Sequence, residues 1–208
     1  MVISKNKRFA LFVVLFFIFS FNSYSDNITL TEIYKKVIAK YNEIKTYEAK
    51  INQENYWSEL DVEKTSTGNI YYDGERFLLK YTEPSGQKLF IEKEVLNIID
   101  ESNKQVFISD LEDFELRPDK ILTYYWKISD KEIITSDEYT KLKLFGETDT
   151  LYVSISNDLI VEILIIDSNN NSVKYKFYDV KINSSLPVNI FELFYPDEFN
   201  VIDNRLNN

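Results

Sequence analysis

The sequence predicts an α+β fold dominated by one antiparallel β-sheet. Short segments with apolar side chains at every second position recur along most of the 208 residues, which is the pattern of strands with one face in water. Two other segments repeat apolar residues every three to four positions, as amphipathic helices do. The gaps between the strand-like segments are of hairpin length, so neighbouring strands are expected to pair antiparallel.

The first 25 residues have the pattern of a signal peptide. Three basic residues precede an apolar run from Phe9 to Phe21, and Ser23 and Ser25 place small side chains before a cleavage site. The run is shorter than the roughly 20 residues that cross a bilayer. We therefore expect cleavage after Ser25 rather than a membrane anchor, which leaves one exported domain over residues 26–208.

The composition excludes several classes of function. Removing Lys5, Lys7 and Arg8 with the signal peptide changes the formal net charge from −10 to −13, and an acidic surface repels nucleic acid and anionic membranes. The chain contains no Cys and no His, so disulfides, an N-terminal lipid-modified cysteine and the usual catalytic triads are excluded. We find no catalytic residues, no metal ligands and no cofactor motif, and we expect a monomeric protein that is not an enzyme.

The first mature element is expected to be a helix. Thr29 and Glu32 have the spacing of a capping box, in which each side chain bonds the free amide of the other residue. The apolar positions that follow recur at helical spacing, and they are Leu30, Ile33, Tyr34, Val37, Ile38, Tyr41 and Ile44.

Strand-like alternation then begins at Tyr47. It is expected in residues 47–53, 68–72, 77–81, 88–92, 95–99, 104–109, 141–144, 151–155, 160–166, 173–182 and 189–195. Asp73-Gly74 and residues 168–171 supply turn residues that tolerate positive φ between neighbouring strands.

A second, short helix is expected where the alternation stops. Pro118 is favourable at a helix start, and Ile121, Leu122, Tyr125 and Trp126 form an apolar set behind it. The stretch 111–137 that contains this helix is long enough to hold an insertion.

The residues alone leave two ways to cover such a sheet. It can fold on itself as a sandwich or barrel with a packed core, or it can curve around a cavity that the two helices close. The second arrangement implies an apolar ligand.

The order and spacing of motifs along the whole mature chain resemble those of the LolA family. The first part of the resemblance is Gly68 to Tyr72, Arg76 to Tyr81, Glu83-Pro84 and Gln87 to Ile91. The second part is Val173 to Asn183, Leu186-Pro187, Phe191 to Phe194, Pro196 and Val201 to Asp203.

The resemblance implies an incomplete, half-open β-barrel of about ten to eleven strands, with two or three helices that cover an apolar cavity as a lid. It also implies a periplasmic carrier of acylated lipoproteins, which receives them from an inner-membrane ABC transporter and passes them to an outer-membrane receptor. Many family members have a basic residue near the turn that here is Asp73-Gly74. Control of the lid is therefore expected to differ in this chain.

The apolar residues of strands and helices are the candidates for an acyl-chain cavity. They are Phe77, Leu79, Leu89 and Ile91 on the sheet, with Ile33, Val37, Ile121, Leu122 and Tyr125 on the helices. Val37→Glu is expected to leave the fold largely intact and to abolish retention of acyl chains, since a charge opposes closure over an apolar pocket. Two alternatives stay open: a secreted sensor or interaction module of the same shape, which binds a protein partner or another lipid, and a ligand-free β-sandwich.

Overall fold

The computed structural model describes residues 29–111, 117–135 and 139–207. The predicted signal peptide lies outside these residues. The elements are α1 (Leu30–Asn42), β1 (Tyr47–Trp57), β2 (Val62–Tyr72), β3 (Arg76–Glu83), β4 (Ser85–Glu92), β5 (Val95–Asp100), β6 (Gln105–Asp110), α2 (Pro118–Ile128), β7 (Asp130–Thr135), β8 (Thr140–Phe145), β9 (Asp149–Ser156), β10 (Leu159–Asp167), β11 (Ser172–Ile182), β12 (Asn200–Asp203) and the 3-10 helix η1 (Asn204–Asn207).

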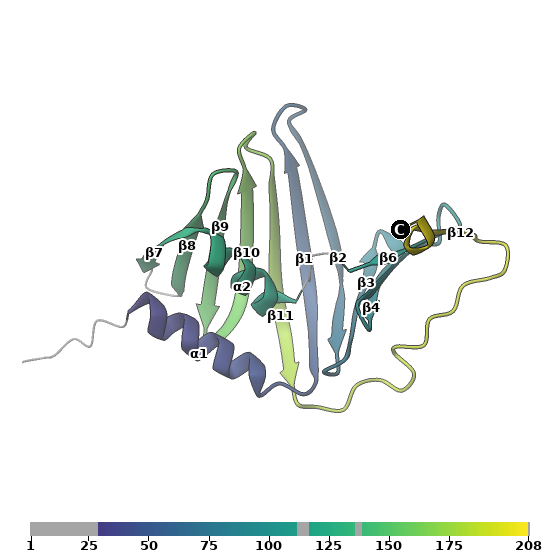
Figure 1. The fold of residues 1–208 in the computed structure, drawn as a ribbon, viewed down its shortest axis with the longest axis horizontal. Helices are drawn as coiled ribbons and strands as arrows, with labels where there is room; N and C mark the ends of the chain where they lie inside the picture. Colours follow the sequence, from purple (N-terminus) through teal and green to yellow (C-terminus); the bar gives the residue numbers. More distant parts are fainter. Residues whose placement is uncertain (1–28, 112–116, 136–138, 208) are drawn as a thin grey trace, which may run out of the picture.

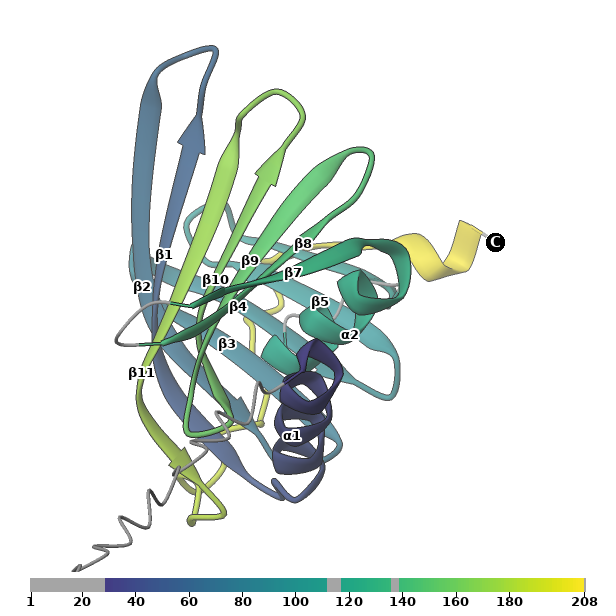
Figure 2. The ribbon, with the colours of Figure 1, turned by 90° about the vertical axis from the view of Figure 1, so that its left-hand side faces the viewer.

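The twelve strands of the described residues form one sheet, which stays open. Its order is β12-β6-β5-β4-β3-β2-β1-β11-β10-β9-β8-β7, so β12 and β7 are its two edges. Every pairing is antiparallel except that of β12 with β6. The sheet curves around both helices, which lie on its concave side (Figure 1 and Figure 2). The predicted α+β, half-open barrel is confirmed, with twelve strands instead of ten or eleven.

Both helices begin where their sequences predict. At α1 the Thr29 amide donates to Glu32 Oε2 at 2.8 Å and the Glu32 amide donates to Thr29 Oγ1 at 3.2 Å, which completes the capping box. Pro118 occupies the first turn of α2, where its missing N–H costs no intrahelical bond. Ile33, Val37 and Tyr41 form the buried face of α1.

Strand β3 is buried on both faces, and the strands β3 to β6 are also covered on their convex side. Phe77, Leu78 and Leu79 are consecutive in β3 and all buried, although neighbours in a strand point to opposite faces. Phe77 and Leu79 belong to the large concave core that also contains the helix residues. Leu78 faces the convex side, where Phe90, Ile99 and Val106 are also buried.

The convex side of these strands is covered by the segment 183–199, which we call the strap. Asn183 holds its start: the Asn183 Oδ1 atom accepts from the Lys45 amide at 2.7 Å, and its Nδ2 group donates to the Glu43 carbonyl at 3.2 Å. Further along, the ring of Phe191 lies 6.4 Å from that of Phe90 and 4.5 Å from the Arg76 guanidinium carbon. The strap then leads into β12 at the edge of the sheet (Figure 1).

One sequence prediction is wrong in this region, and two strands were missed. Residues 189–195 alternate in sequence but lie in the strap and form no strand, because Pro187 and Pro196 flank them and Asn189 has a φ of 60°. β12 and β7 were not predicted: β12 is only four residues long and pairs in parallel, and β7 lies in the stretch that was interpreted as an insertion.

Candidate functional site: an apolar concave face

The nine residues predicted to line an acyl-chain cavity lie together on the concave side. Eight of them are buried, with exposed fractions of 8% or less, and Leu89 is half-buried against the same core. Phe77 lies opposite Ile91 and Leu79 opposite Leu89, so these four share one face of β3 and β4. The sequence therefore grouped these residues correctly, while their role in binding stays a prediction.

The helices fill one half of the concave face. They pack chiefly against β7, β8, β10 and each other, and the rings of Tyr34 and Trp126 stack between them with centroids 4.1 Å apart. The Tyr41 hydroxyl accepts a hydrogen bond from the Ile160 amide at 3.3 Å. Burial raises the pKa of Tyr41 well above its ordinary value, so this hydroxyl stays protonated.

Val37 shows how tightly this half is filled. Its side chain has no exposed surface and lies within the core that joins helices and sheet. A glutamate there would be buried in an apolar environment without a partner, at a cost of several kcal/mol. The expectation that Val37→Glu leaves the fold intact is therefore wrong, because the interface that it would open is part of the core.

Polar contacts at both ends of α2 hold it to the sheet. At its start, the Arg117 guanidinium makes two hydrogen bonds of 2.6 Å to Asp119 and lies 4.5 Å from the centroid of the Tyr72 ring. Near its end, the Tyr125 hydroxyl donates to Asp149 Oδ2 at 2.6 Å, and burial together with this carboxylate raises the pKa of Tyr125.

The turn between β2 and β3 does not supply a basic residue to the helices. Asp73 instead accepts two hydrogen bonds from the Arg76 side chain, at 2.9 and 2.6 Å. Burial opposes ionisation of Asp73, but these bonds and those from the backbone amides outweigh it and hold its pKa below the ordinary value. The basic residue that contacts the sheet here is instead Arg117, the N-cap residue of α2, which lies over the Tyr72 ring and was not predicted from the sequence.

The other half of the concave face is only partly covered. Leu89, Leu96, Ile98 and Phe107 lie on this face in β4, β5 and β6, as their register with Ile91 and Leu79 shows. Leu89 and Leu96 are half-buried, and Ile98 and Phe107 are 39% and 36% exposed. We call these four residues the trough. Three of them were missed from the sequence, although the alternation of residues 95–99 places Leu96 and Ile98 on one face.

A small pocket joins the trough side to the start of α2. It has a volume of about 160 Å³ and is lined by Tyr72, Gly74, Glu75, Phe77, Ile91, Arg117 and Lys120. A cavity of ~150 Å³ accommodates a benzene-sized molecule. Several acyl chains need more room than this, so they require either the open trough or movement of the helices.

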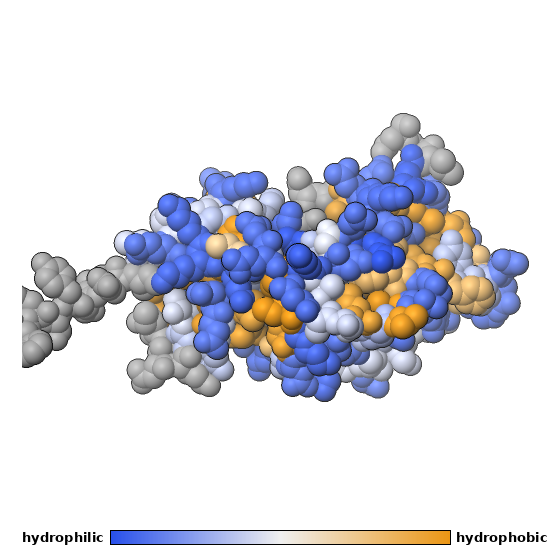
Figure 3. All heavy atoms as spheres, turned by 90° about the horizontal axis from the view of Figure 1, so that it is seen from below, coloured by the Kyte–Doolittle hydropathy of each residue, from blue (hydrophilic) through white to orange (hydrophobic). Residues whose placement is uncertain are grey.

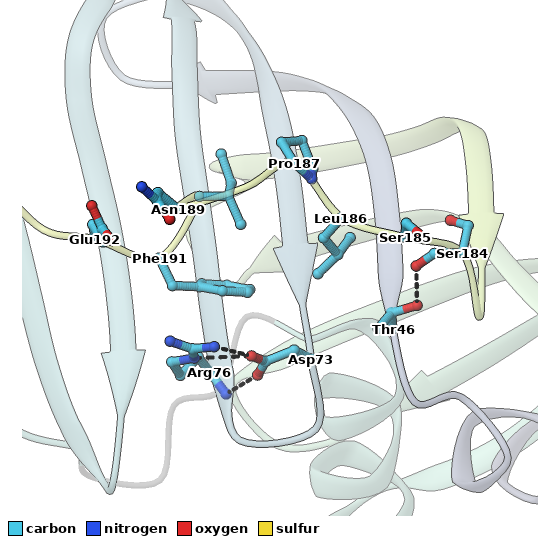
Figure 4. A pocket seen from close by; sticks show the side chains of 11 residues that line it. Thr46, Asp73, Arg76, Ser184, Ser185, Leu186, Pro187, Asn189, Phe191 and Glu192 are labelled. Atoms are coloured by element: carbon cyan, nitrogen blue, oxygen red, sulfur yellow. Dashed lines mark hydrogen bonds and ion pairs between the residues drawn. The ribbon is translucent and has the colours of Figure 1, made fainter.

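Two larger hollows lie on the convex side. One, of about 380 Å³, lies between the strap and the Asp73–Arg76 pair, with the Phe191 ring over Arg76 (Figure 4). The other, of about 640 Å³, lies outside β8 to β11 and is lined by residues such as Tyr178 and Lys176. Seen from below, apolar side chains also gather over the strap (Figure 3), where Val188 and Phe194 are 89% and 80% exposed.

Two features are not found in the described part of the chain. Residues 29–111, 117–135 and 139–207 contain no cluster of three or more His, Cys, Asp or Glu side chains with the geometry to hold a metal ion. None of the helices in these ranges is long and apolar enough to span a membrane.

A curved, open sheet with an apolar concave face that is half covered by two helices defines the fold class of the LolA superfamily. The chain belongs to this family: the model of the outer membrane lipoprotein carrier protein LolA matches residues 42–193. No curated protein matches the sequence.

Solved structures resemble this chain at low sequence identity, and the first of the following three shares its fold. An uncharacterized conserved protein from Thermus thermophilus is 14% identical, with a TM-score of 0.54 over 84% of this chain and 98% of the other. A LolA superfamily protein from Nitrosomonas europaea is also 14% identical, with a TM-score of 0.47 over 80% and 98% of the two chains. The Mycobacterium tuberculosis lipoprotein LppX is 8% identical, with a TM-score of 0.41 over 77% and 100%.

Proposed function

We propose that this protein is a periplasmic carrier that shields the acyl chains of lipoproteins on its concave face. The observation that carries the proposal is the trough, where Ile98 and Phe107 keep more than a third of their surfaces exposed on a face that is otherwise the protein core. An acyl chain laid along the trough would remove this apolar surface from water.

The energetics favour such a carrier. Exposing acyl chains costs ~0.8 kcal/mol per methylene, so a di- or triacylated lipoprotein needs a shield to cross an aqueous compartment. Release also has to be possible, and many weak apolar contacts allow it better than a few strong bonds. The trough and the nine predicted cavity residues are all apolar apart from the hydroxyl of Tyr125.

The transport route that we propose is the one implied by membership of the LolA family. Export would depend on cleavage of the predicted signal peptide after Ser25, the lipoprotein would be received from an inner-membrane ABC transporter, and delivery would be to an outer-membrane receptor. In this scheme α1 and α2 act as the lid: they separate from the sheet to admit more than one chain. No step in it requires catalysis, a metal or a cofactor.

Charged residues introduced on the concave face, compared with one introduced on the convex face, test whether the trough binds acyl chains. The double variant Ile98→Glu/Phe107→Glu should bind a dansylated undecanoic acid probe at least tenfold more weakly than the native protein, a loss of about 1.4 kcal/mol. Val201→Glu is the matched control, since Val201 is 45% exposed at the same edge but faces the convex side. Both variants replace partly exposed residues and should fold.

Identification of the natural cargo is a separate measurement. Mass spectrometry of protein purified gently from its own periplasm should find a diacylglyceryl-cysteine peptide bound to the native protein and lost from the double variant. Equal probe binding by the native protein and the double variant would contradict the trough as the acyl site.

A further inference from the structure

The concave face changes from apolar to polar at one row of the sheet. Ser66, Gln53 and Tyr175 lie directly opposite one another on β2, β1 and β11, and we call them the polar row. The next concave row, nearer to α1, consists of Gly68, Ile51 and Phe177. The polar row therefore borders the apolar part of the face.

Tyr81 extends the polar row toward the trough. Its hydroxyl donates to Gln53 Oε1 at 2.5 Å, and Gln53 Nε2 donates to Asn55 Oδ1 at 3.1 Å. Tyr81 lies on β3, so its side chain crosses β2 to reach β1. Gly68 lies opposite Tyr81 on β2 and has no side chain to block this path, and a Cβ at Gly68 would be 2.6 Å from the Lys80 carbonyl oxygen.

Two hydroxyls of the polar row have no partner among the described residues. Ser66 and Tyr175 are 7% and 8% exposed, and neither hydroxyl makes a hydrogen bond to any residue that the structure describes. Both oxygens keep some accessible surface, unlike the Tyr47 hydroxyl, which is fully enclosed. A polar group that is this deeply buried normally has a partner, so the arrangement leaves two donors available to a bound molecule.

The position of these donors suits a ligand with an apolar chain and a polar linkage. Tyr81 is the next concave residue after Leu79, and Leu79 lies opposite Leu89 of the trough. The hydroxyls of Ser66 and Tyr175 and the second N–H of the Gln53 amide can donate hydrogen bonds, while the Tyr81 hydroxyl already donates to Gln53 and holds it in place. The acceptor at the end of an acyl chain is its ester or amide carbonyl oxygen.

We propose that Ser66, Gln53, Tyr81 and Tyr175 form a subsite for the carbonyl oxygen of the ester or amide that joins an acyl chain to its head group. This inference rests on the proposed function and adds chemical specificity to it. The subsite fixes how far a chain enters, because the carbonyl group stops at the polar row while the methylenes lie along the trough.

A matched pair of ligands isolates the carbonyl. 1-Palmitoylglycerol has an ester carbonyl, whereas 1-O-hexadecylglycerol has an ether oxygen and the same chain length. In displacement of the dansylated undecanoic acid probe, the native protein should bind the ester roughly tenfold more tightly than the ether, because the ether leaves the buried donors without a carbonyl acceptor. Tenfold corresponds to about 1.4 kcal/mol. Tyr175→Phe and Gln53→Leu should each lower this ratio to between about one and two.

Tyr178→Phe is the matched control for Tyr175→Phe. Tyr178 lies on the convex side of the same strand and is 43% exposed, so the ester-to-ether ratio should stay at its native value. Repeating the displacement with a dipalmitoylglyceryl-cysteine peptide and with dipalmitoyl phosphatidylethanolamine distinguishes a lipoprotein from a membrane lipid as the source of the ester. A loss of affinity for either ester in Tyr175→Phe that exceeds the loss for the ether supports the subsite.

The two proposals fail in different ways. Equal binding of ester and ether by the native protein, or equal weakening of both in Tyr175→Phe, overturns the subsite and leaves the carrier function standing. If neither ligand displaces the probe from the native protein, the carrier function fails and the subsite with it.

Discussion

Arg117 joins the start of α2 to the sheet. Its guanidinium bonds to Asp119, which is only 4% exposed, and it lies over the Tyr72 ring on the sheet. One side chain thus neutralises a buried carboxylate and joins the helix start to the sheet. A buried ion pair of this kind contributes little net stability, but removal of one partner leaves the other charge uncompensated.

Substitutions at this pair should therefore be strongly non-additive. Arg117→Met is expected to lower the free energy of unfolding by about 3 kcal/mol, because Asp119 keeps a buried charge without its partner. Arg117→Met/Asp119→Leu should recover most of this loss, since no buried charge remains. Urea unfolding measures both variants, and equal losses in the two would show that the charge of Asp119 is not the cause.

At the residue scale, the sequence predicted burial well and polar contacts poorly. Spacing of apolar positions placed Ile33, Val37, Ile121, Leu122 and Tyr125 in the core. The Arg117–Tyr72 contact and the Tyr125–Asp149 hydrogen bond join segments far apart in the chain. No local pattern indicates such pairs, because they depend on how the sheet curves.

Among the elements, the strap has the clearest structural role. It lies on the convex side of β3 to β6, where the Phe191 ring is 6.4 Å from that of Phe90. Four residues are buried on this side: Leu78, Phe90, Ile99 and Val106. Each fully buried side chain of this size contributes ~1.5–3 kcal/mol relative to exposure. The strap is therefore part of the core of this half of the molecule, although it contains no helix or strand.

Truncation of the strap tests this role. A chain that ends at Ser185 should bind anilinonaphthalene sulfonate strongly and aggregate, because the four convex residues become exposed. A chain that ends at Asp203 lacks only η1 and the last residue, and should behave like the full-length protein. A monomeric Ser185 truncation with native unfolding behaviour would show that the convex face needs no cover.

Elements that are stabilised by residues close in sequence were predicted. Elements that depend on contacts with distant parts of the chain were not. The capping box of α1 and Pro118 of α2 act within one turn of a helix, and hairpin strands pair with their neighbours in sequence. Residues 189–195 alternate like a strand but lie on the outside of a completed sheet, where no edge is available to pair with them. β12 depends on a distant partner, β6, and its four residues are too short for a pattern.

For the whole molecule, the absence of His determines the response to pH. The chain has no side chain with an ordinary pKa between 5 and 8. Hydrogen bonds from Ser102 and Asn103 lower the pKa of Asp100 to about 2, and those from Arg76 lower the pKa of Asp73 against the effect of burial. Burial raises the pKa of Tyr41 and Tyr175.

The free energy of unfolding should therefore be flat from about pH 5 to pH 9. The folded protein binds protons on Asp73 and Asp100 more weakly than the unfolded chain, in which Asp has a pKa of ~3.9. Stability is then lost as the pH falls below about 4 and toward 2. The pKa of the buried tyrosines is shifted in the opposite direction, because the folded protein holds their protons more tightly than the unfolded chain. Stability is therefore also lost above about pH 10.

Urea unfolding between pH 2.5 and pH 10.5 measures this profile. Asp100→Ala should be less stable than the native protein by about 1 kcal/mol at pH 7, a modest value because the carboxylate is close to solvent. The difference should shrink as the pH falls from about 4 to 2.5, because the pH then approaches the folded-state pKa of Asp100, which is about 2. A stability change centred between pH 5 and pH 8 would contradict this assignment of the titrating groups.

The late position of the strap in the chain has a consequence for biogenesis. A polypeptide is made from its N-terminus, so the strands β3 to β6 exist well before residues 183–199 are joined to them. During that interval one side of these strands has no cover and presents aromatic and aliphatic groups to any chaperone or neighbouring nascent chain. Maturation of this half of the protein thus has to follow completion of synthesis, and holdase factors should be engaged until the final residues emerge.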